Sequence, residues 1–197
     1  MSTALVIGDV QAGILETFPW SRTVLGPLQS LLPQARATGV HLIYVRAALR
    51  GTQADIPQRN PIATWMAGAG ELFHEDSPQT RIHPDIAPSP DEPVVTKRRV
   101  SAFTGTDLDS MLRARDVHSI VLAGVATSGV VLATLIAAVE LDYAVTVLTD
   151  CCADQDEAVH TLLTTVVFPG RGARILTASD WITEISDSRA LGERPAD

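Results

Sequence analysis

The chain has 197 residues, of which 46% are hydrophobic and 19% are charged, and its formal net charge is −8 at pH 7. This length and composition predict a single folded domain over residues 1–197 and exclude a disordered chain. The negative charge argues against a general nucleic-acid or membrane-surface binder, and no apolar run is long enough to predict a transmembrane helix. No signal peptide is expected, because no basic region precedes the short apolar run at the N-terminus.

Two adjacent residues, Cys151 and Cys152, are the only cysteines of the sequence. Neighbouring residues are poorly placed to form a disulfide with each other, so both thiols are expected to be free. Free cysteines are typical of reducing compartments, and we therefore predict a cytoplasmic protein.

The N-terminal half begins with short apolar runs separated by a longer run at helical spacing. Residues 4–7 predict a buried strand that is followed closely by Asp9. Apolar residues over 24–38 predict a helix, which Pro33 is expected to kink or interrupt. Residues 40–45 then predict a second buried strand.

Two segments lack such periodicity and predict loops: residues 10–23 and residues 47–92, of which the second is rich in proline. A short helix is expected within the second segment, near residues 62–67. A loop region of this length inside a compact domain is typically functional, so we expect it to contribute to a site.

The C-terminal half alternates predicted strands with predicted helices. The strands are residues 93–96, 119–123, 144–148 and 173–176. The helices are residues 107–114, 130–141, 154–167 and 178–185, the third with Asp154 as its N-cap. This alternation predicts an α/β fold with a Rossmann-like, mostly parallel β-sheet and helices on both faces, that is, a three-layer α/β/α arrangement.

Small and β-branched residues at 124–129 connect a predicted strand to the helix that follows, with Thr127 or Ser128 as the expected N-cap. The N-terminus of a helix directs backbone N–H groups into the crevice at the carboxyl edge of an open sheet, where ligands bind. This turn therefore predicts an oxyanion-binding or substrate-binding element made of Ala126, Thr127, Ser128 and Gly129.

Asp9 and Lys97 both follow predicted strands and should share that sheet edge. A carboxylate and an ammonium beside backbone donors suit acid–base chemistry next to an oxyanion site. From the residues alone, Asp9 could equally cap a loop, and Lys97 could be solvated within the basic run 97–99. Gln11 could point into the crevice or hydrogen-bond within its loop, and Phe18 could wall the pocket or pack in the core.

Four segments of this chain resemble the isochorismatase-like, or cysteine hydrolase, superfamily, which includes isochorismatases, nicotinamidases and N-carbamoylsarcosine amidases. The segments are ALVIGDVQAG from Ala4, VVTKRRVSAFTGTDLDSMLR from Val94, IVLAGVATSGVVLAT from Ile120 and TDCCADQDEAVH from Thr149. The resemblance covers residues 3–181 and implies a parallel sheet with helices on both faces. It also implies that Asp9 is the catalytic aspartate, that Lys97 is the catalytic lysine, and that residues 124–127 form a turn that commonly contains a non-proline cis peptide.

One position departs from the amidases of this superfamily, which carry a nucleophilic cysteine in the first turn of the helix. The resemblance aligns Val130 with that cysteine, and a valine side chain has no nucleophile. Cys151 or Cys152 could approach the same edge instead, but packing is the favoured role for both. Ser101 and Ser128 carry hydroxyl groups near the site, and turn and cap roles are favoured for them.

We therefore expect a hydrolase of the isochorismatase family that acts on a small molecule through Asp9 and Lys97. One alternative is a catalytically inactive member that binds a small metabolite or serves as an oligomeric scaffold. Another is an isochorismatase-type enol-ether hydrolase, because isochorismatases also lack the cysteine and use acid chemistry on a vinyl ether. No cofactor is expected, and no metal, since His74 and His83 form no short ligand pair with an aspartate.

The resemblance also implies a homo-oligomer, either a dimer or a tetramer. Apolar residues in the long loop region are consistent with an interface between subunits. The competing interpretation is that they cover their own pocket as a lid. These residues are Trp65, Met66, Leu72 and Phe73.

Overall fold

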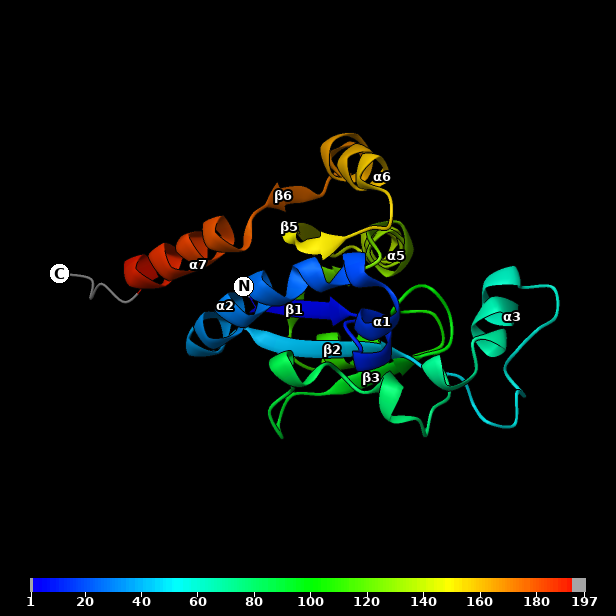
Figure 1. The fold of residues 1–197 in the computed structure, drawn as a ribbon. Coiled ribbons are helices and arrows are strands. Elements are labelled where there is room, and N and C mark those ends of the chain that lie inside the picture. Colours follow the sequence, from blue (N-terminus) through cyan, green and yellow to red (C-terminus); the bar gives the residue numbers. More distant parts are fainter. Residues whose placement is uncertain (1, 193–197) are drawn as a thin grey trace.

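The computed structural model describes the backbone of residues 2–192 and the side chains of residues 2–187. A six-stranded sheet with the strand order β3-β2-β1-β4-β5-β6 lies at its centre (Figure 1). The strands are β1 (Ser2–Gly8), β2 (His41–Ala47), β3 (Val94–Lys97), β4 (Val117–Val125), β5 (Ala144–Ala153) and β6 (Arg174–Leu176). Every pairing between them is parallel, which confirms the predicted α/β fold.

Alternate residues of each central strand face two separate apolar cores, because successive side chains of a strand point to opposite faces. Leu5 and Ile7 of β1 belong to one core, and Ala4 and Val6 belong to the other. The first core contains residues of α1 (Ala12–Thr17), α2 (Leu25–Ala37) and α7 (Ala178–Gly192). The second contains residues of α4 (Leu108–Arg113) and α5 (Leu132–Glu140).

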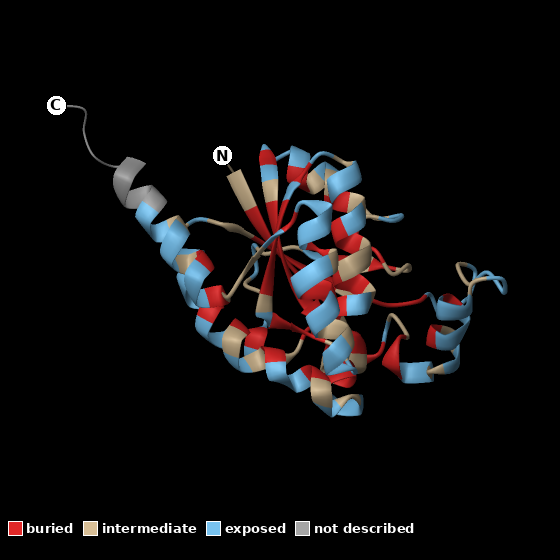
Figure 2. Ribbon diagram, turned by 90° about the horizontal axis from the view of Figure 1, so that it is seen from above, coloured by how far each residue is buried: buried red, intermediate tan, exposed pale blue. Residues whose placement is uncertain are grey.

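The result is a sheet between two helical layers. Figure 2 shows strands that are largely buried and helices whose outer surfaces are exposed. Within residues 2–192, none of the helices combines the length and apolar character that a membrane crossing requires.

One predicted helix forms without the interruption expected at Pro33, a second forms where it was predicted, and one predicted loop is more ordered than expected. α2 continues through Pro33 without a break. α3 (Pro61–Gly68) forms where a short helix was predicted, because Asn60 Oδ1 accepts hydrogen bonds from the first-turn amides and Pro61 occupies the first position. Residues 10–23 hold α1 and most of a 3₁₀ helix (Pro19–Val24) instead of a loop.

The connection from β4 to α5 differs from the prediction of a single capped helix. A π-helical turn, Thr127–Val131, precedes α5, and neither Thr127 nor Ser128 caps it with its side chain. Thr127 Oγ1 lies 2.8 Å from His160 Nδ1, and the Ser128 amide donates to Asp154 Oδ2 at 2.7 Å. Two side chains from a distant segment therefore hold this turn.

The prediction that Asp154 caps the following helix is wrong, because its side chain binds the Ser128 amide instead. Helix α6 (Glu157–Leu162) is capped instead by Asp156, whose Oδ1 accepts from the Ala158 amide at 2.9 Å. The predicted helix over residues 154–167 is accordingly shorter, and its last turn is a π-helix, Leu163–Val167.

Strand β5 extends beyond its predicted end. Leu122 of β4 pairs with Val147, whereas Gly124 pairs with Cys152, so β5 contains an irregularity between these pairs. Extra residues on one strand make such a bulge and allow pairing to resume further along. Cys151 and Cys152 consequently lie within the strand, where Cys151 is fully buried.

Replacement of Gly124 by alanine should destabilise the protein by roughly 2–6 kcal/mol, measured by chemical unfolding. Gly124 has φ of +133°, which side chains rarely adopt, and a Cβ atom there would overlap the backbone carbonyl oxygen of Gly8 on β1. Gly26→Ala in α2 is the matched control, because no atom lies within 4 Å of its Cβ position. The control should be neutral or slightly stabilising. Equal stabilities of the two variants would contradict this role of Gly124.

Candidate active site

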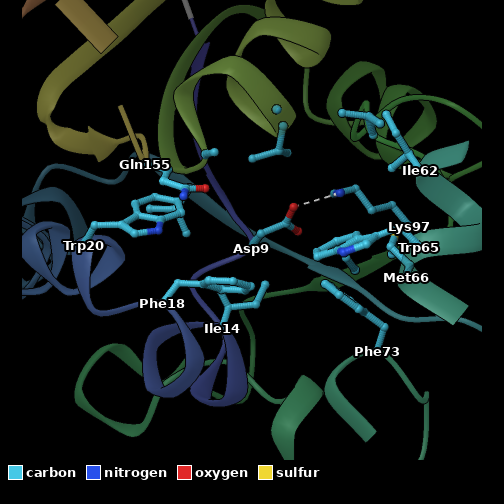
Figure 3. A pocket seen from close by; sticks show the side chains of 16 residues that line it. Asp9, Ile14, Phe18, Trp20, Ile62, Trp65, Met66, Phe73, Lys97 and Gln155 are labelled. Atoms are coloured by element: carbon cyan, nitrogen blue, oxygen red, sulfur yellow. Dashed lines mark ion pairs between the residues drawn. The ribbon is translucent and has the colours of Figure 1, made fainter. Parts of the chain in front are cut away.

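A cavity of about 250 Å³ opens at the carboxyl edge of the sheet, beside the ends of β1, β2, β3 and β4 (Figure 3). Parallel strands bring residues that are distant in sequence to this edge. The predicted site residues that line the cavity are Asp9, Phe18, Lys97, Ala126, Gly129 and Val130. Three predicted residues do not line it: Gln11, Thr127 and Ser128.

An ion pair between Asp9 and Lys97 forms the polar part of the cavity. Lys97 Nζ lies 2.8 Å from Asp9 Oδ2 and donates a hydrogen bond to the Arg99 carbonyl at 3.2 Å. The two residues are 7% and 3% exposed, respectively. Strand β2 separates β1 from β3 and ends at Ala47, which pairs with Lys97 and also lines the cavity. The predicted proximity of the two groups is confirmed.

The Asp9 carboxyl group has one oxygen in the ion pair and one oxygen free. Oδ1 is buried and has no hydrogen-bond partner among the described residues. Burial raises the pKa of Asp9, and the neighbouring Lys97 acts in the opposite direction. A carboxyl group with a raised pKa exchanges its proton closer to neutral pH than an ordinary aspartate does.

The backbone at Asp9 turns sharply to present this side chain. Its φ is +59°, in the left-handed region that aspartate tolerates better than most residues. Its amide still donates to the Val45 carbonyl at 2.9 Å, so the turn begins directly beside β2. The end of β1 therefore aims Asp9 into the cavity.

Gln11 holds the same loop from outside the cavity. Its side-chain Nε2 donates to the Ala47 carbonyl at 3.1 Å, and its Oε1 accepts from the Ala47 amide at 2.7 Å. This fully buried amide continues the hydrogen-bond ladder between β1 and β2 after the backbone of β1 has turned away. Of the two roles considered for Gln11, the structure therefore shows the hydrogen-bonding one, and the side chain does not point into the crevice.

The turn after β4 contributes backbone to the cavity wall. The peptide bond between Val125 and Ala126 is cis. The Ser128 amide is bonded to Asp154, and the Gly129 amide donates to the Ala126 carbonyl at 3.0 Å. The amides of Ser128 and Gly129 already have acceptors, so an oxyanion would have to be bound by the other backbone amides of residues 126–130.

Val130 occupies the space that the resemblance assigns to a nucleophile. It lines the cavity and lies over Gly8, where a Cβ atom would come within 2.8 Å of a Val130 methyl group. Gly8 thus has to be glycine for Val130 to pack so closely. No thiol is supplied at this position.

Neither cysteine lies at the cavity wall. Cys151 and Cys152 are both buried in β5, and burial raises the pKa of each thiol, to about 12 for Cys152. A buried thiol with a raised pKa is a poor nucleophile, because the thiolate is the reactive form.

The long loop region supplies a wall that the sequence only partly indicated. Trp65 and Met66 of α3 and the nearby Phe73 line the cavity, whereas Leu72 is buried without lining it. Trp65 remains 55% exposed. Gln155, which no sequence pattern indicated, also reaches the cavity, from the loop after β5 (Figure 3).

The two histidines considered as metal ligands hold their own loops. His74 Nδ1 accepts from the Asp76 amide, and His83 Nδ1 accepts from the Asp85 amide. In the part of the chain that the structure describes, no three metal-ligating side chains gather at one point.

A family model, the isochorismatase domain, matches residues 3–180 of the sequence. The chain belongs to the isochorismatase family. It is similar to the isochorismatase-family protein YwoC of Bacillus subtilis, with 33% identity over 86% of this chain and 87% of that protein. It is 31% identical to the ureidoacrylate amidohydrolase RutB of Stutzerimonas stutzeri over 75% of this chain and 68% of that protein. A cysteine hydrolase from Pseudomonas syringae has the same fold, with a TM-score of 0.86, 26% identity and coverage of 94% and 92% of the two chains.

Substitution of Lys97 by methionine should destabilise the protein by about 3–5 kcal/mol near neutral pH, as measured by urea unfolding, because it leaves a buried carboxylate unpaired. A raised pKa means that the folded state favours the protonated carboxyl. The stability that protonated Asp9 contributes is complete below its pKa in the unfolded chain, near 3.8. It is lost as the pH rises through the pKa of Asp9 in the folded protein. Lys97→Met removes the group that lowers the pKa of Asp9, so burial raises that pKa further in the variant. The stability deficit of Lys97→Met relative to the wild type should therefore shrink as the pH falls and Asp9 becomes protonated.

The double variant Asp9→Asn/Lys97→Met is the control for this experiment. Asparagine tolerates the left-handed backbone at position 9 and carries no charge, so the double variant should recover at least half of the lost stability. A single variant as stable as the wild type, or a double variant as unstable as the single one, would contradict the pairing.

Proposed function

We propose that this member of a hydrolase family hydrolyses a small molecule by acid–base chemistry, without a cysteine nucleophile. Water adds across the bond that breaks, and Asp9 Oδ1 passes a proton between this water and the leaving group. Lys97 balances the charge at Oδ2 and stabilises a developing anion. Backbone amides of the 126–130 turn bind the oxyanion. The observation that carries this proposal is the buried Asp9 Oδ1, which has no hydrogen-bond partner among the described residues. The cavity is also lined by Val130, the residue that the resemblance aligns with the nucleophile.

The relatives support the class of reaction more than the substrate. RutB is an amidohydrolase of ureidoacrylate, and an N-carbamoylsarcosine amidase from Arthrobacter is 30% identical over 57% of this chain. Amides are therefore one substrate class to test. Enol ethers are the other, because cleavage of an enol ether by acid chemistry needs no thiol.

Val130 also favours a second candidate function, that of a catalytically inactive member that binds a small metabolite. Loss of the nucleophile would leave the cavity intact, and its apolar wall would still bind a ligand. The retained Asp9–Lys97 pair weighs against this candidate, because a binding protein has no need for a buried charge pair with a free oxygen.

The proposal also includes the cellular location and the oligomeric state of the protein. Two free, buried cysteines support a cytoplasmic location. Exposed apolar side chains on α5, α6 and the turn that follows support a homo-oligomer, either a dimer or a tetramer. These side chains are Ile136, Val139, Leu162 and Val166.

The test is a panel of small amides and enol ethers, followed by Asp9→Asn on any compound that is hydrolysed. Asparagine keeps the shape of the side chain and removes the proton-transfer group, so kcat should fall by roughly 10²–10⁴. Turnover by the wild type should survive thiol alkylation.

Cys151→Ala and Cys152→Ala are the matched controls, and both should retain turnover. Loss of turnover in either cysteine variant, together with a covalent acyl adduct detected by mass spectrometry, would overturn the cysteine-independent mechanism. Binding without turnover of any compound would favour the inactive member.

A further inference from the structure

We infer that the substrate is a small, uncharged molecule with an apolar or aromatic body and one neutral hydrogen-bonding group, and that this cavity discriminates against carboxylates. This inference rests on the proposed function only in taking the cavity as the substrate site. Three features of the cavity support it: the aromatic lining, the balance of charges and the placement of the polar atoms.

The wall of the cavity presents two aromatic pairs. Phe18 and Trp20 have ring centroids 6.2 Å apart, and Trp65 and Phe73 have centroids 5.5 Å apart in an edge-to-face arrangement. Figure 3 shows Phe18 and Trp20 on one side of Asp9, and Trp65 and Phe73 on the other side, where Lys97 also lies. Aromatic rings on two sides favour a flat or compact apolar body, and a cavity of about 250 Å³ limits that body to a small molecule.

The charges at the cavity cancel. Among the described residues, Asp9 and Lys97 are the only ionisable ones that line it, and they form an ion pair with a distance of 2.8 Å between Asp9 Oδ2 and Lys97 Nζ. Lys97 also donates to the Arg99 carbonyl, so part of its hydrogen-bonding capacity is used inside the protein. An incoming carboxylate would add a second negative charge beside Asp9 without a free cation to balance it.

The neighbouring arginines are engaged elsewhere. Arg98 forms ion pairs with Asp55 at 2.7 Å and with Glu75 at 3.0 Å. Arg99 donates to the Asp55 carbonyl at 3.1 Å and to the Arg98 carbonyl at 2.6 Å. Neither guanidinium lines the cavity. The basic run that follows β3 therefore does not form an anion-binding site here.

The remaining polar atoms suit a neutral group. Asp9 Oδ1 is a buried acceptor that needs a donor, such as an amide N–H or a hydroxyl group. Gln155 is exposed at the opening of the cavity, and its side-chain amide offers both a donor and an acceptor without charge. A carboxamide or an alcohol can satisfy both, whereas a carboxylate has no proton to donate to Asp9.

Isothermal titration calorimetry with isosteric ligand pairs tests this inference at neutral pH. The pairs are benzamide with benzoate and phenylacetamide with phenylacetate. The neutral member of each pair should bind at least about tenfold more tightly than the anion. Trp65→Ala should weaken binding of the neutral members by about tenfold, since Trp65 covers the body of the ligand, and its partial exposure makes the substitution compatible with folding.

Gln155→Arg, with Gln155→Met as its uncharged control, provides the complementary test. The arginine variant should raise the affinity for benzoate relative to benzamide, and the methionine variant should not. Equal or tighter binding of the carboxylates by the wild type would overturn the inference. Binding of neither class, or benzamide binding that is insensitive to Trp65→Ala, would also overturn it.

Turnover is measured separately with the two amides and with an amide that also carries a carboxylate. Neutral compounds that bind in this cavity but are never hydrolysed would contradict the proposed catalytic function and leave the ligand class intact. Faster hydrolysis of an amide that also carries a carboxylate, such as 4-carbamoylbenzoate, than of benzamide would support the catalytic function and contradict the ligand class.

Discussion

The buried ion pair between Asp9 and Lys97 is the interaction on which the rest of the site depends. Two charges removed from water are stable only when they remain together, so each residue fixes the position of the other. The strand order brings the two residues to one edge of the sheet, because β1 and β3 lie on either side of β2 and all three strands are parallel. The pair in turn leaves one carboxyl oxygen of Asp9 for chemistry.

Polar side chains from outside the cavity hold the loops that surround this pair. The Gln11 amide replaces backbone pairing beside β2. Asp154 holds the Ser128 amide, and His160 holds the Thr127 hydroxyl group. A site needs such support, because its reacting groups must be placed within fractions of an ångström. The segment after β5 therefore contributes to the geometry of the turn after β4 as well as to the cavity wall through Gln155.

Short apolar runs that end at Asp9, Lys97 and the 124–129 turn were sufficient to predict a parallel sheet and a shared edge. The helix α3 was also predictable, since Asn60 and Pro61 are strong local signals. The role of Asp154 was not, because an aspartate before a helix usually caps that helix and only the fold brings it to the Ser128 amide. The bulge of β5 likewise depends on pairing with β4 and has no local signature.

The aromatic wall of the cavity could be predicted only in part from the sequence. Trp65, Met66 and Phe73 were recognisable as an apolar group, but whether they face a subunit or their own cavity depends on how α3 packs, which short-range pattern does not specify. Their place at the cavity supports the lid interpretation, while an oligomer remains a proposal supported by other side chains. The same wall lines the cavity that contains the ion pair, where burial raises the pKa of Asp9.

A titration of the Asp9 carboxyl carbon by NMR in the wild-type protein tests the central claim without knowledge of the substrate. We expect a pKa above the ordinary value of 3.8, because burial outweighs the opposing effect of Lys97. Asp9→Asn identifies the resonance by its disappearance. A pKa at or below 3.8 would show that the ion pair outweighs burial, and Asp9 would then be a fixed anion instead of the proton-transfer group.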